Sequence, residues 1–526
     1  MGYDILIKNA RIIDGTGNPW YKSDIGIHNS KIVQIGRNLN NADILIDASG
    51  LIASPGFIDM HSHADMTIPF EPRQDSMIRQ GITTVVIGNC GFSLAPINED
   101  KIHLIQKQVD IFIPAGASID FKWRSFEEYL SNIEEDKCIF NVVPLVGFGT
   151  IRIAGGPAFE DRVPTFEEYF NMKNYVEEAM KAGATGLSTG LIYTPQIFAQ
   201  TQEVIELAKI VGKYNGLYFS HIRNESSRVI EAIKELITIV EQSGCIGGQV
   251  AHHKVSGRIN WGKSKNTLEL ISDAYSRSLN VTCDQYPYNR GMTSLVTLLP
   301  PWVHVGGVNK ILEHLISEES KQRIKEDMNK GLEEVKGWEN WFKTVGTSHI
   351  YISSVKSRKL KAIEGKNIAE ITKIKNFEDD FETLFSLLLE EKAEVTMTIE
   401  TMGDEDIERI MTNRLTMIGT DGWGVSSGGN FDYGKPHPRF YGTYPRILGK
   451  YVREKRLLSL EQAIRKMTSF PAQKLGLHDR GLLREGSWAD IVIFDPQAIR
   501  DEATFDNPHQ FPKGIHYVIV NGEIVV

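Results

Sequence analysis

The chain has 526 residues, a net charge of -9, 41% hydrophobic residues and 24% charged residues. This length excludes a small disulfide- or metal-stapled module, and the acidic balance argues against a general binder of nucleic acid or of an anionic membrane. No apolar run reaches the roughly 18 residues that a membrane helix needs. We therefore expect a small-molecule partner.

The cysteines suggest where the protein works. Cys90, Cys138, Cys245 and Cys283 show no close pairing, and the start of the chain lacks the segments of a secretory signal. Both observations favour a reducing compartment, and we predict a cytoplasmic protein. A homo-oligomer is compatible with the sequence.

Short β-rich runs dominate both ends of the chain. In residues 1–55 they are separated by Gly, Asn and Asp turn signals, which predict a small antiparallel sheet. Residues 476–526 have the same character and contain Asn521-Gly522, a preferred hairpin turn. Because each terminal segment is too short to bury an apolar face alone, we predict that the two ends form one small β-sandwich domain.

Between these ends, over residues 56–475, short apolar strands alternate with helical patterns. This alternation is typical of an α/β fold with a parallel sheet. Eight candidate strands end near His61, Cys90, Gly147, Thr189, His221, His252, Asp284 and Asp421. Eight such units predict a (β/α)8 TIM barrel with reactive side chains at the carboxyl ends of its strands. Residues 303–392, rich in Lys and Glu, predict an amphipathic helical insertion before the last strand.

Two histidines follow the first barrel strand, in Pro55-Gly56-Phe57-Ile58-Asp59-Met60-His61-Ser62-His63. Residues i and i+2 of a strand point to the same face, so both imidazoles are expected to enter one site. A metal ion bound by both side chains would explain two imidazoles in one site. For this short pattern alone, two satisfied or exposed histidines are an equally good interpretation.

A cysteine and two further histidines end other strands. Taken singly, Cys90 is more simply a small buried hydrophobe, and His221 and His252 are core histidines. Together they provide the three protein ligands, thiolate and imidazole, that catalytic zinc uses. His253 would face away from His252 on a strand, and we place it behind the ligands; the sequence leaves open which of the two binds.

Asp421 closes the last candidate strand, in Met417-Ile418-Gly419-Thr420-Asp421-Gly422. A carboxylate beside a metal-bound water can take its proton and later hand it to a leaving amine. The simpler alternative is a turn aspartate before glycine. Lys254, Arg439 and Tyr193 would complete an anion site, since a guanidinium can grip a carboxylate through two parallel hydrogen bonds; in isolation, solvated surface residues would explain the two cations.

Longer segments around these positions occur in an order that resembles a known family. They are Pro55 to His63, Gly88-Asn89-Cys90-Gly91, Gly186-Leu187-Ser188-Thr189-Gly190-Leu191, His221-Ile222-Arg223-Asn224-Glu225, His252-His253-Lys254, Pro436-His437-Pro438-Arg439 with Tyr441-Gly442-Thr443, and Gly486-Ser487-Trp488-Ala489-Asp490-Ile491-Val492. This set resembles the amidohydrolase superfamily and, within it, the N-acyl-D-amino-acid deacylase (D-aminoacylase) family. The resemblance covers nearly the whole chain.

The resemblance implies a site as well as a fold. It implies one zinc ion held tightly by Cys90, His221 and His252, and a second, weaker metal position at His61 and His63 beside Cys90 and Asp421. It implies that Asp421 is the catalytic acid/base. By the same resemblance, the substrate, chiefly its α-carboxylate, would be bound by Tyr193, Lys254, Tyr288, Ser294 and Arg439.

Three features depart from the superfamily pattern. The fourth strand region, residues 184–189, has no lysine to bridge two metals, so Cys90 is the available bridge. Gly147-Phe148-Gly149 stands where the resemblance leads us to expect Gly-His-Gly. The 303–392 insertion is longer than the family leads us to expect. The roles of Phe148 and of the insertion therefore stay open, as does the choice of substrate.

We expect the enzyme to hydrolyse the amide bond of N-acyl-D-amino acids to a carboxylate and a free D-amino acid. The same chemistry on an L,D-dipeptide, another amide or a cyclic ureide is an alternative. A non-catalytic protein that kept the fold is an alternative from another class. The sequence does not give the acyl group or the D-side chain.

Overall fold

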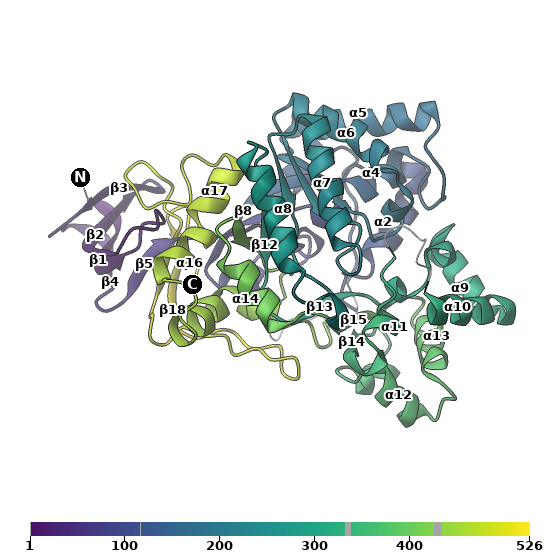
Figure 1. Cartoon of the computed structure of the whole chain (residues 1–526). Helices are drawn as coiled ribbons and strands as arrows, with labels where there is room; N and C mark the ends of the chain where they lie inside the picture. The colour runs from purple at the N-terminus through teal and green to yellow at the C-terminus, as the bar shows by residue number, and fades with distance from the viewer. Residues whose placement is uncertain (1, 116, 332–337, 426–432) are drawn as a thin grey trace.

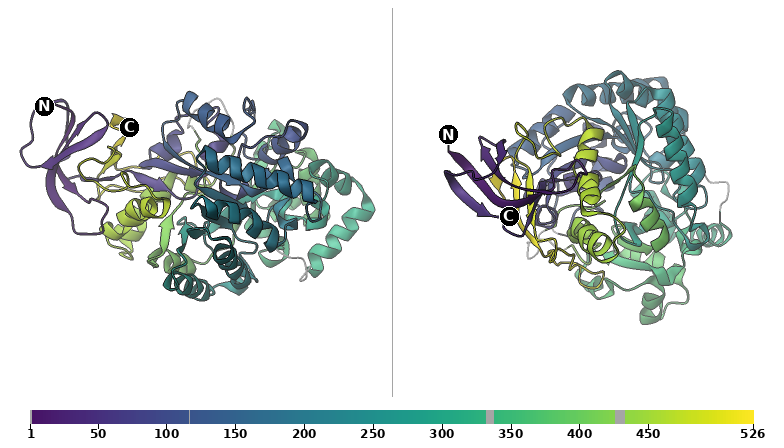
Figure 2. Two further views of the ribbon diagram at one scale, coloured as in Figure 1. Left: turned by 90° about the horizontal axis from the view of Figure 1, so that it is seen from above. Right: turned by 60° about the vertical axis from the view of Figure 1, so that its left-hand side comes forward.

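The computed structural model describes residues 2–115, 117–331, 338–425 and 433–526. A central barrel lies between a β sheet at one end and the inserted helices α9 to α13 at the other (Figure 1). Both chain termini lie at the β-sheet end of the molecule (Figure 2). Within the described residues, no helix is long and apolar enough to cross a membrane.

Eight parallel strands form the barrel, and the predicted (β/α)8 fold is confirmed. In sheet order they are β6 (Phe57–Asp59), β7 (Ile82–Ile87), β8 (Asn141–Gly147), β9 (Gly186–Gly190), β10 (Leu217–His221), β11 (Gly247–Val250), β12 (Val281–Gln285) and β16 (Thr416–Ile418). The sheet closes where Met60 N donates to Ile418 O at 3.2 Å and Ser62 forms a parallel bridge with Gly422. Most strand residues are buried, as expected for a parallel sheet covered by helices.

Helices cover the outside of the barrel between successive strands. They are α1 (Asp75–Ile78), α2 (Ile102–Val109), α3 (Phe126–Glu135), α4 (Phe148–Gly155), α5 (Phe166–Ala182), α6 (Thr201–Lys213), α7 (Val229–Ser243), α8 (Ser264–Ser276), α14 (Asp404–Thr412), α15 (Arg439–Arg446), α16 (Leu460–Met467) and α17 (Ser469–Leu475). Local signals set their ends: α5 begins with a capping box between Thr165 and Glu168 and ends at Gly183, which has a φ of 112°.

The two chain ends share one sheet. It contains β1 (Tyr3–Ile12), β2 (Tyr21–His28), β3 (Lys31–Gly36), β4 (Ala42–Asp47), β5 (Ile52–Pro55), β17 (Ile491–Phe494), β18 (Ile515–Val520) and β19 (Glu523–Ile524). The prediction of a wholly antiparallel N-terminal sheet is wrong, because β4 and β5 both pair parallel to β1 along one edge. The turn residues in the sequence marked where strands end but not the direction in which the next strand pairs.

The segment between β12 and β16 carries its own small sheet as well as helices. The helices are α9 (Val308–Ile316), α10 (Glu318–Lys330), α11 (Trp341–Thr344), α12 (Ile368–Lys375) and α13 (Asp380–Glu390), and the antiparallel strands are β13 (Arg290–Ser294), β14 (Ile350–Ser354) and β15 (Thr396–Glu400). A separate apolar core, including Leu298, Ile352 and Leu384, holds this insertion together. We therefore propose that it begins at β13 and ends at β15, wider than residues 303–392.

Asp490, in the sequence Ala489-Asp490-Ile491, ties the terminal sheet to the barrel. Its Oδ2 accepts a hydrogen bond from Asn141 Nδ2 of β8 at 3.0 Å and also pairs with Arg480. Its Oδ1 accepts from Asn521 N at 2.8 Å. A single buried carboxylate therefore contacts a barrel strand and the turn after β18.

Replacing Asp490 with Ala is expected to lower the free energy of unfolding by about 1–3 kcal/mol, because three partly buried donors lose their acceptor. Thermal unfolding followed by circular dichroism measures this. Asp490→Asn, which keeps one acceptor oxygen, should fall between the native protein and the Ala variant. An unchanged Tm for Asp490→Ala would contradict this role.

Candidate metal centre

The predicted metal-binding side chains meet at the carboxyl ends of the barrel strands. His61 and His63 follow β6, Cys90 follows β7, His221 ends β10, His252 follows β11 and Asp421 follows β16. Each is less than 10% exposed to solvent. His61 and His63 lie just beyond β6, on either side of the Ser62 bridge that closes the barrel.

Unusual backbone conformations turn three of these residues. Cys90, His252 and Asp421 have φ angles of 55°, 33° and 50°, a left-handed region that residues other than glycine rarely adopt. Gly88, just before Cys90, also has a positive φ, and a Cβ there would lie 2.0 Å from Leu145 O. Such conformations cost free energy and persist where the surrounding structure fixes them, typically at functional sites.

The Cys90 sulfur lies at the centre of the group. Its Sγ is 3.3 Å from His61 Nε2, 3.4 Å from His252 Nε2 and 3.8 Å from His221 Nδ1. Three overlapping triplets have ligand atoms within 4.8 Å of one another: His61, His63 and Cys90; Cys90, His221 and His252; and His61, His252 and Asp421. A thiolate with imidazoles is a donor set that zinc prefers, so these residues fit a divalent ion.

Carboxylates stand behind the imidazoles. Glu225 Oε1 is 3.1 Å from His252 Nδ1, and its Oε2 is 3.5 Å from His221 Nε2. Asp284 Oδ1 is 3.7 Å from His61 Nδ1. A carboxylate on the outer nitrogen orients a metal-binding imidazole and makes it more basic. Glu225 is not among the residues predicted for the site, although its position four residues after His221 was the available signal.

The protein alone favours uncharged ligands. Burial raises the pKa of the Cys90 thiol well above its usual value. Burial likewise lowers the pKa values of His61 and His221 well below theirs. Neutral imidazoles are ready to bind a metal, and a divalent cation would supply the charge that stabilises a thiolate.

Asp421 is held as an anion. Its Oδ2 forms an ion pair with Arg439 Nη1 at 2.8 Å, and its Oδ1 is 3.4 Å from His63 Nε2. Burial alone would raise the pKa of this carboxyl, but Arg439 and the nearby histidines hold it well below its usual value. An ionised carboxylate in this position can accept a proton.

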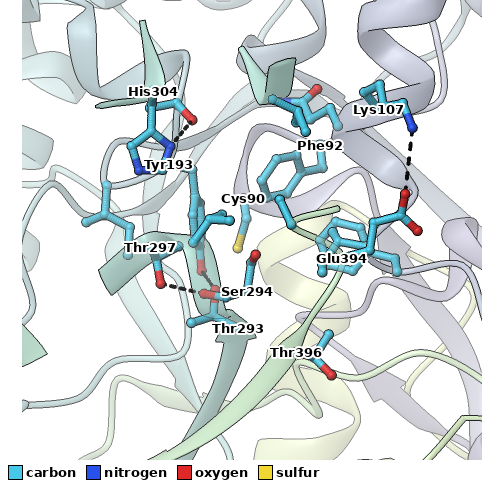
Figure 3. Close-up of a pocket in the computed structure, with 18 of the residues that line it drawn as sticks. Cys90, Phe92, Lys107, Tyr193, Thr293, Ser294, Thr297, His304, Glu394 and Thr396 are labelled. Carbon is cyan, nitrogen blue, oxygen red and sulfur yellow. Dashed lines mark hydrogen bonds and ion pairs between the residues drawn. The ribbon is translucent and has the colours of Figure 1, made fainter. Parts of the chain in front are cut away.

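Most of the predicted substrate-binding residues lie around one pocket. Tyr193 packs against His221, with ring centroids 4.9 Å apart. Lys254 Nζ is 2.7 Å from Glu225 Oε1, and Tyr193, Lys254 and Asp421 border the same cavity. Ser294 and Arg439 line the adjoining space. Figure 3 shows the Cys90 sulfur between Tyr193 and Ser294.

Tyr288 is placed elsewhere. Its ring packs against His437 at 5.1 Å, and its hydroxyl lies 3.5 Å from Pro438 O. Tyr286 borders the pocket instead, with the Arg439 guanidinium 4.6 Å from the centre of its ring. Tyr286 is not among the predicted residues, because the Tyr-Pro-Tyr segment follows β12 as an irregular loop, where alternation along a strand no longer predicts the direction of a side chain.

His253 and Phe148, whose roles the sequence left undecided, both face away from the metal centre. His253 Nε2 lies 2.8 Å from Thr267 Oγ1 of α8. Phe148 is fully buried at the start of α4 and does not line the pocket. At the position where Gly-His-Gly was expected, the Phe148 side chain therefore packs beside the barrel and not along the pocket.

Comparisons with known proteins agree with this geometry. The amidohydrolase family profile matches residues 45–238 and 362–526. The D-aminoacylase of Alcaligenes xylosoxydans xylosoxydans is 32% identical, covering 99% of this chain and 94% of that protein. The N-acyl-D-aspartate and N-acyl-D-glutamate deacylases of the same organism are each 33% identical, covering 99% of this chain and 92% and 93% of those proteins.

Solved structures show the same relationship. The N-acyl-D-glutamate deacylase of Bordetella bronchiseptica, complexed with zinc and a phosphonate mimic of the tetrahedral intermediate, has a TM-score of 0.83 and 31% identity. The match covers 100% of this chain and 97% of the deacylase chain. A D-hydantoinase covers 99% of this chain and 95% of its own, with a TM-score of 0.54 at 16% identity, and shares the fold alone.

Replacing Cys90 with Ala is expected to weaken zinc binding by at least about 100-fold, since the change removes the atom common to two of the ligand triplets. Zinc content after dialysis, measured by elemental analysis, tests this. Cys283→Ala is the matched control, because Cys283 is fully buried in β12 outside the ligand triplets. Equal zinc content in the two variants would refute the role of Cys90.

The neighbouring histidines provide a second test. His252→Ala should weaken zinc binding by at least about 100-fold, whereas His253→Ala should change it by less than about tenfold. The structure gives the reason: His252 Nε2 points at the Cys90 sulfur and His253 Nε2 points at Thr267. Zinc titration of both variants measures the difference, and the opposite order would make His253 the ligand.

Proposed function

The chain belongs to the amidohydrolase family, and from this membership we propose that it hydrolyses the amide bond of N-acyl-D-amino acids to a carboxylate and a free D-amino acid. Its relatives of similar length are a D-aminoacylase and two N-acyl-D-amino-acid deacylases. The observation that carries the proposal is the Cys90, His221 and His252 cluster directly beside an ionised Asp421 and a cationic pocket wall.

The proposed tight zinc site uses Cys90, His221 and His252. We assign a second, weaker metal position to His61 and His63 beside Cys90 and Asp421. Zinc held by Cys90, His221 and His252 would activate water and polarise the acyl carbonyl. Glu225 and Asp284 fix the orientation of the imidazoles from behind.

Asp421 is the proposed carrier of the proton. As an anion it accepts a proton from the attacking water, and the same oxygen then donates that proton to the nitrogen of the leaving amine. Arg439 holds one carboxylate oxygen at 2.8 Å, which leaves Oδ1 beside the two histidines to exchange the proton.

The cationic wall is the proposed binding site for the substrate's α-carboxylate. Lys254 and Tyr286 border one cavity together with Tyr193, and Arg439, whose guanidinium lies over the Tyr286 ring, borders the adjoining cavity; these three residues form the cationic wall. The described residues offer no hydrogen-bond partner to the buried Arg439 Nε, which can therefore donate to a ligand oxygen. Substrates without the carboxylate should consequently bind poorly. Ser294, one of the predicted substrate-binding residues, lines the pocket. We assign to Tyr286 the substrate-binding role that was predicted for Tyr288.

Further predictions and alternatives from the sequence stand beside this proposal. A cytoplasmic location and a homo-oligomer stay predictions of the sequence. L,D-dipeptides and cyclic ureides would meet the same metal centre, and a substrate panel distinguishes them from N-acyl-D-amino acids. Absence of zinc after purification without chelators would favour the alternative of a non-catalytic protein that kept the fold.

Asp421→Asn is expected to lower kcat on an N-acetyl-D-amino acid by about 1000-fold, because the amide cannot carry the proton. Zinc content should stay unchanged, which separates the loss of proton transfer from a loss of metal. The native enzyme should hydrolyse the D-enantiomer in strong preference to the L-enantiomer. Substantial turnover by the Asn variant would exclude Asp421 as the acid/base.

A further inference from the structure

The turn that carries Cys90 has a left-handed backbone along most of its length. It contains the short 3-10 helix η2 (Asn89–Gly91), and Gly88, Cys90 and Gly91 have φ angles of 74°, 55° and 75°. This conformation is disfavoured for a residue that has a Cβ. The backbone that presents the central sulfur of the metal centre must therefore be fixed by its surroundings.

Ser188, in the middle of β9, binds this turn on both sides of Cys90. Its Oγ accepts a hydrogen bond from Gly91 N at 3.0 Å and donates one to Gly88 O. The side chain is fully buried. Because a hydroxyl can donate and accept at once, this single oxygen spans the turn around the cysteine.

Gln196, the first residue of the 3-10 helix η4 (Gln196–Phe198), binds the main chain of Cys90 itself. Its Nε2 donates to Cys90 O at 3.0 Å, and its Oε1 accepts from Gly190 N at 2.7 Å. Gln196 is also fully buried, and a Cβ on Gly91 would overlap its Oε1. The amide therefore joins the turn to the end of β9 and fills the space behind it.

Ser188 and Gln196 lie outside the pocket. Among the residues that the structure describes, neither lines the two cavities that Asp421 borders, and neither belongs to a ligand triplet. Their hydrogen bonds end on main-chain groups of the turn and, for Gln196, of β9. Any effect of these two residues on the metal centre must consequently pass through the position of Cys90.

We propose that Ser188 and Gln196 are positioning residues that direct the Cys90 sulfur toward the imidazoles of the zinc site. This inference rests on the proposed function, because it requires zinc on that sulfur. Removing either side chain leaves buried main-chain groups of the turn without their partners. The turn then relaxes toward an ordinary conformation and carries the sulfur away from histidines that other strands hold. In this way β9, which has no lysine to hold a metal, supports the cysteine ligand instead.

Ser188→Ala and Gln196→Met remove these hydrogen bonds with little change in volume. We expect each to weaken zinc binding by about tenfold or more, measured by titrating the zinc-free protein against a competing chelator. In the protein loaded with Co²⁺, the absorption band of the thiolate–cobalt bond should weaken or shift, because the geometry at the sulfur has changed. This spectrum reports on Cys90 and does not depend on turnover.

Thr189→Val is the matched control. Thr189 follows Ser188 on β9 and is also fully buried, but its Oγ1 lies 2.8 Å from the Tyr218 hydroxyl and 2.9 Å from Ser220 Oγ. This variant loses a buried hydroxyl on the opposite face of the strand, and it should keep the native zinc affinity and cobalt spectrum. An equal loss of zinc affinity in Thr189→Val would overturn the inference. Circular dichroism checks that each variant is folded, and Gln196→Met carries the test if Ser188→Ala does not fold.

The Cys90→Ala variant separates positioning from a general structural role. If Ser188 acts through the sulfur, adding Ser188→Ala to Cys90→Ala should change zinc affinity by less than about twofold. Equal weakening with and without the sulfur overturns the inference. Native zinc affinity and cobalt spectrum in both Ser188→Ala and Gln196→Met also overturn it, and they leave the proposed function standing. A native protein that binds no zinc overturns the proposed function and this inference with it.

Discussion

Backbone hydrogen bonds between the ends of the first and last strands both close the barrel and bring the metal-binding residues together. Asp421 N donates to His61 O at 2.7 Å, which joins the end of the last strand to the end of the first. Without this closure the carboxylate and the two N-terminal histidines, separated by most of the chain, would have no reason to meet. The strained φ of Asp421 is thus held by the same contact that completes the sheet. Fold stability and site geometry are consequently one constraint, and the chemistry cannot be separated from the barrel that supports it.

Different surroundings give the buried carboxylates different roles. Asp421, beside Arg439, has a pKa well below its usual value and is an anion. Behind it, burial raises the pKa of Asp284 to about 6 and that of Asp59 to about 8. Asp59 is occupied by Thr420, whose backbone and hydroxyl both donate to it. Surroundings that give similar carboxyl groups different pKa values indicate that the groups have different roles. One carboxylate is exposed to the reacting site, and the others fix the residues around it.

Strand ends were the part of the structure that the sequence could predict. Each metal-binding candidate follows a short apolar run, and the carboxyl ends of parallel strands share one edge, so His61, Cys90 and His221 could be grouped without coordinates. The conformations of loops and the pairing partners of strands could not be predicted from the sequence. Tyr286 and Tyr288 are alike in the sequence, and only the loop conformation selects the former. The parallel pairing of β4 with β1 depends on which edge of β1 is available for pairing. The short strand β14 lies within a mainly helical insertion, where the sequence predicted helices alone. These failures share one cause, since contacts distant in the sequence decided each of them.

The two parts of the pocket have separate origins in the chain. Lys254 and Tyr286 follow barrel strands, and Arg439 begins α15, so the barrel itself provides the groups proposed to bind a carboxylate. The adjoining space is lined partly by the insertion, through Val296, Leu299 and Ile311, and the insertion has an independent core. The two are still connected, because Glu339 of the insertion accepts a hydrogen bond from Glu225 N, next to the carboxylate that orients His221 and His252. Burial and the nearby Glu225 raise the pKa of Glu339 to about 8, which keeps this contact largely free of a second negative charge at pH 7. An insertion attached in this way can change which substrate enters while leaving the metal ligands and Asp421 in place.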